Sequence, residues 1–168
     1  MPEPKTIERA REDKRKGKSP STQAGEFVRQ EFHHIREGKH GARSARQAIA
    51  IGLSKARRAG VQLSAPPRGR FSSKVRRQAQ RDYQKGQHHR DGHVSRRRSR
   101  ATLGALRHEG REAASTRALS RHAYRAARRR APSERSASAH KAVRTKGPAG
   151  LSAAGRKAAR TRMSRYYL

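Results

Sequence analysis

Apolar residues recur with helical spacing in two neighbouring segments of the N-terminal part of the chain. In the first segment they are spaced by four, four and three positions: Ala24, Val28, Phe32 and Ile35. This spacing places them along one face of an α-helix. Either Ser19-Pro20 or Ser21-Thr22 is a suitable helix start, and Gly38 is a suitable C-terminal stop. The pattern predicts an amphipathic helix over about residues 20–37.

The second segment begins with Ser44 and has Gln47 three residues later, which fits a capping box. Its apolar and small residues again share one helix face: Ala45, Ala48, Ile49, Gly52, Leu53 and Ala56. Gly60 follows, so we expect a helix over about 45–59. The connection over 38–43 is short and contains glycine, which favours a helical hairpin domain over residues 20–62.

The hydrophobic pattern weakens on both sides of this hairpin. Residues 1–19 are predicted to be a disordered lead, and the Pro- and Gly-rich residues 63–70 a linker. Over residues 71–99 we expect a short helix, at about 71–85, followed by a polar loop.

Residues 100–168 form an Arg/Ala-rich basic segment with an internal repeat. The pattern S-x4-[RK]-A-[AV]-R-x-[RK] begins at Ser120, Ser136 and Ser152, a constant offset of 16 residues. Ala and Arg favour helix, but like charges at i,i+3 and i,i+4 oppose it in free solution. We therefore predict a mostly disordered arm with short helix-prone blocks, separated by Pro132 and Gly147-Pro148. The fold class expected for the whole chain is all-α.

The charge changes this picture more than any motif does. The chain has 168 residues, 44 Lys and Arg against 12 Asp and Glu, a formal net charge of +32, and 31% hydrophobic residues. Residues 1–62 carry +8 of this charge, and residues 63–168 carry +24. A charge of this size favours a polyanionic partner, because lysine and arginine side chains that meet phosphates release condensed counterions.

The sequence gives no sign of an enzyme, a membrane protein or a secreted protein. The chain has no cysteine, and it contains no phosphate-binding loop, dinucleotide fingerprint or nucleophile elbow. We expect no enzymatic activity and no cofactor. No apolar run is long enough for a membrane span, and the N-terminus lacks the apolar core of a secretion signal. The expected location is the cytoplasm, in association with the nucleoid.

The hairpin connection is the sharpest candidate for a positioned phosphate contact. A helix N-terminus offers unpaired backbone N–H groups and a positive dipole end. The candidate residues there are Lys39, His40, Arg43 and Ser44, and the same basic surface continues along the second helix with Lys55, Arg57 and Arg58. An ordinary interhelical turn with solvated basic side chains is the alternative.

The remaining candidate nucleic-acid-binding residues lie in the C-terminal half of the chain. They are Arg96, Arg97, Arg98, Arg125, Arg128, Arg129, Arg130, Lys141, Arg144, Lys146, Arg156, Lys157, Arg160 and Arg162. Single-strand binders stack bases on aromatic side chains, and this chain has only 3 Phe, 4 Tyr and no Trp. Duplex DNA is therefore favoured over single-stranded RNA.

Two groups of histidines suggest metal binding: His33, His34 and His40, and separately His88, His89 and His93. Neither group is joined by cysteine, and neither completes a familiar zinc spacing. We expect no metal site. The His33–His34 pair is interpreted as helix surface, and the second group as part of a polar loop.

The stretch from Thr22 to Gly60, with HHIREGKH and QAIAIGLSKARRAG, resembles an uncharacterised family of small basic bacterial proteins. The opening MPEPKTIERAREDKRKGKSPS and the blocks near KGPAGLSAAGRKAARTR are similar to members of the same family. The resemblance implies no activity, ligand or partner. The C-terminal blocks also resemble the Lys/Ala-rich tails of bacterial histone-like proteins.

Together these features predict sequence-independent binding of nucleic acid, DNA in preference to RNA, by phosphate neutralisation. Two alternatives remain open. One is an RNA- or ribosome-associated protein, and the other is an adaptor whose hairpin, residues 20–62, binds a protein partner or a second copy while the arm acts as a tether. No membrane partner is expected.

Overall fold

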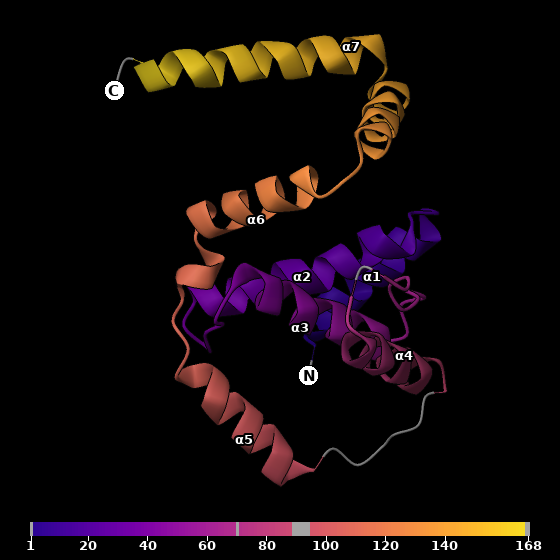
Figure 1. Cartoon of the computed structure of the whole chain (residues 1–168), viewed down its shortest axis with the longest axis vertical. Helices are drawn as coiled ribbons and strands as arrows, with labels where there is room; N and C mark the ends of the chain where they lie inside the picture. The colour runs from indigo at the N-terminus through magenta and orange to yellow at the C-terminus, as the bar shows by residue number, and fades with distance from the viewer. Residues whose placement is uncertain (1, 70, 89–94, 167–168) are drawn as a thin grey trace. The chain divides into compact units, whose positions relative to one another are not determined.

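The computed structural model describes residues 2–69, 71–88 and 95–166, and every regular element in them is helical. In chain order the elements are α1 (Pro4–Arg15), α2 (Pro20–Arg36), α3 (Ala45–Arg58), α4 (Ser73–Gln87), α5 (Arg96–Arg107), the short 3-10 helix η1 (Glu112–Ala114), α6 (Thr116–Arg128) and α7 (Pro132–Tyr166). The all-α prediction is confirmed for the described part of the chain. The chain divides into two compact units, Met1–His122 and Ala123–Leu168 (Figure 1).

The predicted hairpin of α2 and α3 forms the centre of the first unit. The two helices run antiparallel: Ala24 and Phe27 share a buried cluster with Ala56, while Phe32 and Ile35 share another with Ala48. Midway between these clusters the helices approach closely, because a Cβ atom on Gly52 would lie 2.7 Å from the Val28 Cα atom. The glycine therefore sets the distance at which the two helices pack.

The start of α3 follows the predicted capping pattern with one difference. The Ser44 hydroxyl accepts a hydrogen bond from the Gln47 backbone N–H at 3.2 Å. The Gln47 side chain reaches back to the backbone N–H of Arg43, at 2.8 Å, rather than to that of the cap residue itself. The first bond satisfies a donor that the first turn of a helix leaves unpaired, and the second satisfies the N–H of the residue before the cap.

The N-terminal residues differ from the prediction of a disordered lead, since they form α1 and pack against α2. Ala10 is 4% exposed and Thr6 is 6% exposed, and Ile7 packs against the cluster that contains Phe27. Apart from Ile7, the contact face of α1 consists of small and polar residues. A hydrophobic pattern search cannot find such a face, because little large apolar surface marks it.

Helix α4 confirms the short helix predicted after the linker, and it packs against α3. Its large apolar residues do not make the contact: Phe71, before the helix, is 42% exposed and Val75 is 45% exposed. Instead α4 presents Ala79, Asp82 and Gly86, all buried. A Cβ atom on Gly86 would lie 1.9 Å from the Arg57 carbonyl oxygen, so the backbones of α3 and α4 meet directly there. Residues 89–94 of the predicted polar loop, including His89 and His93, lie outside the described residues, whereas residues 96–99 at its end are helical and belong to α5.

The beginning of the predicted arm packs back onto the hairpin. The short helix η1 buries Ala113 and Ala114 in the cluster that contains Phe32 and Ile35, and Leu119 of α6 packs against the same cluster. Small alanines again make the contact, which explains why composition alone suggested a solvated segment. The first unit thus extends well beyond residues 20–62.

The second unit, Ala123–Leu168, consists of the end of α6 and all of α7. The prediction of a mostly disordered arm is not supported, because its described residues form helices. High helix propensity of Ala, Arg and Lys accounts for the helices. The predicted breakers are present: α7 begins at Pro132, and Gly147 interrupts it with non-helical angles of φ 64° and ψ 174°, directly before Pro148. Figure 1 shows the resulting bend in α7.

Within the described residues, no helix combines the length and the apolar character that a membrane span requires.

Candidate nucleic-acid interface

The second unit combines many exposed basic side chains with almost no acidic residues. Residues 123–168 contain 13 Lys and Arg and a single acidic residue, Glu134. All the predicted binding residues in this unit are exposed: Arg125, Arg128, Arg129, Arg130, Lys141, Arg144, Lys146, Arg156, Lys157, Arg160 and Arg162. No described side chain of this unit is buried. Its helices therefore offer charge without a hydrophobic core of their own.

The two helices distribute this charge differently. In α6, the arginines recur at intervals of four, four and three residues: Arg117, Arg121, Arg125 and Arg128. That spacing places them on one helix face. The Arg128 guanidinium also lies over the Tyr124 ring, 5.7 Å from its centroid. In both halves of α7 the basic residues point around the helix axis, which is typical of a helix that packs against no protein surface.

Helix α5 begins with three consecutive exposed arginines, Arg96, Arg97 and Arg98. The Ser95 hydroxyl accepts a hydrogen bond from the Arg98 backbone N–H at 3.4 Å. Cations at a helix N-terminus are opposed by the helix dipole, whereas an anion there is favoured. A phosphate would relieve the repulsion among these side chains, so they remain candidates.

Part of the hairpin connection that was predicted to contact phosphate is bonded within the protein. The Gly41 N–H donates to the Leu106 carbonyl at 2.8 Å, and the Ala42 N–H donates to the Gly110 carbonyl at 3.1 Å. A Cβ atom on Gly41 would lie 1.8 Å from the Glu109 carbonyl oxygen, so the two segments are in direct backbone contact. Lys39, Arg43 and Ser44 remain exposed, but His40 is only 8% exposed.

The basic residues predicted on α3 make contacts within the protein. Lys55 Nζ lies 2.5 Å from Glu31 Oε2. Arg58 Nε lies 2.7 Å from Asp82 Oδ1, although the Arg58 side chain remains largely exposed. Arg57 is buried and donates from Nε to the Leu63 carbonyl at 3.0 Å.

These contacts explain the roles of two buried acids that the sequence analysis did not single out. Asp82 also accepts a hydrogen bond from the Ser54 hydroxyl at 2.7 Å, and this bond joins α3 to α4. A further hydrogen bond comes from Gln78 Nε2 of α4 itself, at 3.0 Å. Burial lowers the pKa of the Arg57 guanidinium, and the nearby Asp82 charge opposes that effect. Lys55 and Arg57 are therefore structural residues as well as predicted binding residues.

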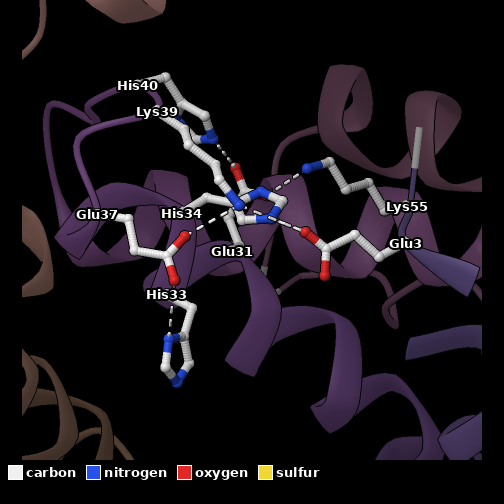
Figure 2. Close-up of polar contacts among 8 residues, drawn as sticks. All are labelled: Glu3, Glu31, His33, His34, Glu37, Lys39, His40 and Lys55. Carbon is white, nitrogen blue, oxygen red and sulfur yellow. Dashed lines mark hydrogen bonds and ion pairs between the residues drawn. The ribbon is translucent and has the colours of Figure 1, made fainter. Parts of the chain in front are cut away.

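A buried polar cluster lies where α2 meets the hairpin connection (Figure 2). One ligand atom from each of Glu31, His34 and His40 lies within 4.8 Å of the others. The Glu31 side chain has no exposed surface, and the His34 side chain is 12% exposed. Of the three histidines grouped in the sequence, His33 does not join: its side chain is 65% exposed and lies 3.7 Å from Glu37. The sequence analysis did not include Glu31 with these histidines.

Exposed ion pairs surround this cluster. His34 Nε2 lies 2.8 Å from Glu3 Oε1, and Lys39 Nζ lies 2.9 Å from Glu37 Oε2. The hydrogen bond with His34 lowers the pKa of Glu3, and the hydrogen bond with Lys39 lowers the pKa of Glu37. The same contact with Glu37 raises the pKa of Lys39. Lys39 is therefore already paired with carboxylates.

Comparison with protein families, with curated proteins and with solved structures finds no match to this chain. The resemblance to a family of small basic bacterial proteins, and that of the C-terminal blocks to histone-like tails, therefore stay predictions.

Proposed function

We propose that this protein binds nucleic acid without base specificity, with duplex DNA as its main partner, through the basic helices of residues 123–168 and the arginines at the start of α5. The proposed function is binding without catalysis. It neutralises phosphates, and so compacts or protects DNA in association with the bacterial nucleoid.

The observation that carries the proposal is the exposure of the basic side chains in the second unit. Thirteen Lys and Arg accompany one acid there, so carboxylates of that unit cannot neutralise them. Lys55 and Arg58 of the first unit contrast with this, since they contact the buried acids Glu31 and Asp82. Phosphate is the polyanionic group that arginine binds best, through its planar pair of donors.

Duplex DNA is preferred because the exposed basic surface has few aromatic residues for base stacking. Tyr124 is 63% exposed, but the Arg128 guanidinium lies over its ring. Binding through phosphates requires only cations and therefore depends little on base sequence.

The salt dependence of duplex binding tests this mechanism directly. If six to ten phosphates are contacted, the affinity should fall by about 10³–10⁵ between 50 and 200 mM salt. Fluorescence anisotropy with a labelled duplex of random sequence measures this fall. An affinity that does not change with salt contradicts the mechanism.

Two variants with the same change in net charge test where binding occurs. In the first, four exposed basic residues of α7 become glutamine: Arg156, Lys157, Arg160 and Arg162. In the matched control, four exposed basic residues of α1 become glutamine: Arg9, Arg11, Lys14 and Arg15. The α7 variant should reduce the salt slope by about three to four, since each phosphate contact contributes about 0.9. Equal reductions in both variants would show that only total charge matters.

Competition at one salt concentration separates the alternatives. A structured RNA that displaces duplex DNA at stoichiometric amounts would favour an RNA- or ribosome-associated protein. If neither nucleic acid binds at physiological salt, the arm is better interpreted as a tether and the hairpin as a surface for a protein partner or a second copy.

A further inference from the structure

We propose that Glu31, His34 and His40 form a binding site for a divalent transition-metal ion of the Zn²⁺ class. The three residues come from α2 and from the connection before α3, and one ligand atom from each lies within 4.8 Å of the others. One carboxylate and two imidazoles are a donor set that zinc sites use, with a fourth position left for water. This proposal is independent of nucleic-acid binding.

The orientation of His40 leaves its second nitrogen facing Glu31. His40 Nδ1 lies 3.0 Å from the Gly41 carbonyl oxygen. A carbonyl can only accept, so Nδ1 carries the hydrogen of this bond. Metal-binding histidines usually donate their other ring N–H in this way, which fixes the ring and leaves Nε2 as the ligand.

The spacing between His40 and Glu31 suits a shared cation. His40 Nε2 lies 3.4 Å from Glu31 Oε1. A charge-assisted hydrogen bond would be shorter, about 2.7–2.9 Å. Two ligands of a tetrahedral zinc ion, each about 2.0–2.1 Å from the metal, lie about 3.3–3.4 Å apart. The observed separation therefore matches a pair of metal ligands better than a hydrogen bond.

Glu31 supplies the second, independent reason to expect a ligand. Its side chain has no exposed surface, and its Oε1 atom has no hydrogen-bond partner among the described residues. A buried carboxylate oxygen without such a partner is costly. Its other oxygen, Oε2, is bound by Lys55 Nζ at 2.5 Å, which leaves Oε1 directed into the cluster (Figure 2).

His34 completes the set with the same kind of outer support. Its Nε2 atom lies 2.8 Å from Glu3 Oε1, so Nδ1 is the nitrogen left for an ion. The His34 and His40 rings lie nearly perpendicular, at 85°, with centroids 6.1 Å apart. The ligand atoms of Glu31, His34 and His40 all lie within 4.8 Å of one another.

Lys55 limits the affinity of this site and also provides a sharp test of it. Its ammonium group is close to the proposed ion and repels it. Replacing Lys55 with glutamine removes the charge and keeps an N–H donor for Glu31 Oε2. This change should tighten metal binding, which is the opposite of what a damaged fold would produce.

The experiment uses the full chain, freed of metal with a chelator and then titrated with Zn²⁺ against a chromophoric competitor. One equivalent of Zn²⁺ should bind with saturation, and Co²⁺ should give the intense visible absorption of a tetrahedral site. His34→Ala and His40→Ala should each weaken binding by about tenfold or more. The matched control is His33→Ala, which changes an exposed neighbouring histidine outside the cluster and should leave the affinity unchanged.

The Lys55→Gln variant should bind Zn²⁺ about tenfold or more tightly than the natural chain. Far-UV circular dichroism checks that each variant keeps its helices. The proposal is overturned if no stoichiometric ion binds, if His33→Ala weakens binding as much as His34→Ala and His40→Ala, or if Lys55→Gln fails to tighten it.

Discussion

The two units of this protein are both helical, but different forces make them so. In residues 1–122, helices bury Phe27, Ile35 and a series of alanines, and acids such as Glu31 and Asp82 pair with basic residues inside the fold. In residues 123–168, no described side chain is buried and the single acid is Glu134. Packing selects the helices of the first unit, whereas propensity alone supports those of the second.

The largest expected difference is in the response to a deleted apolar side chain. Ile35 has no exposed surface, and Leu151 in α7 is 37% exposed. Ile35→Ala should destabilise the first unit by about 2–5 kcal/mol, enough to unfold much of so small a core. Leu151→Ala should change stability by about 0.5 kcal/mol or less. Urea unfolding followed by circular dichroism measures both, and similar losses would show that α7 has a core of its own.

Replacing a glycine by alanine should lower stability in the first unit and raise it in the second. A Cβ atom at Gly52 would lie 2.7 Å from the Val28 Cα atom, whereas a Cβ atom at Gly155 in α7 meets nothing within 4 Å. Gly52→Ala should therefore cost about 1–3 kcal/mol through the forced separation of α2 and α3. Gly155→Ala should increase helix stability by about 0.5–1 kcal/mol. The first is read from thermal unfolding and the second from the helix signal at low temperature.

Hydrogen exchange should separate the units by rate. Amides of α2 around Phe32 should be protected up to the stability of the first unit, while those of α7 should exchange quickly, because none of the described side chains of α7 is buried. Addition of duplex DNA should slow exchange in α7 and increase the total helix signal, since phosphates remove the repulsion among its basic residues. An α7 that is as well protected as α2 without DNA would contradict the comparison.

The smallest expected effect is a loss of folding stability at low pH. The pKa of Glu3 is lowered by its hydrogen bond with His34, and that of Glu37 by its hydrogen bond with Lys39, both from an ordinary value of 4.5. Their stabilising contribution is complete above pH 4.5 and is lost as the pH falls below that value through the lower folded pKa. Both groups are exposed, so salt should weaken the effect.

Melting temperatures measured from about pH 3 to pH 6 test this. Glu3→Gln should flatten the decrease below pH 4.5, and Glu8→Gln, an exposed change on α1, should leave it as in the natural chain. If the melting temperature decreases identically in all three proteins, Glu3 does not contribute to the pH dependence of stability.

Sequence periodicity predicted α2 and α3 because large apolar residues such as Phe32 and Ile35 mark their faces. It missed α1 and η1, whose contacts depend on Ala10, Ala113 and Ala114. Alanine has the same appearance in a solvated helix and in a tight contact, so composition could not distinguish them. The arm was predicted to be disordered for another reason, the repulsion between like charges at i,i+3 and i,i+4, yet its described residues form helices.

The candidate site could be predicted only in part, for a related reason. Exposed basic residues of α5, α6 and α7 follow from charge alone. The role of Lys55 depends on its contact with the Glu31 carboxylate, 24 positions away in the chain. The role of Arg57 depends on its contact with the Leu63 carbonyl, 6 positions away. The cluster of Glu31, His34 and His40 likewise needs the turn of the connection to bring His40 back over α2.

The interruption of α7 at Gly147 affects how this helix can follow a curved surface. An unbroken helix of 35 residues would be a rod about 52 Å long. With the break, α7 becomes two rods of about 22 and 28 Å, each shorter than the roughly 34 Å of one turn of B-form DNA. A long straight rod touches a curved or twisting surface along a tangent and then departs from it. Two short rods joined at one residue can meet such a surface twice, at different angles, with no extra length of chain between them.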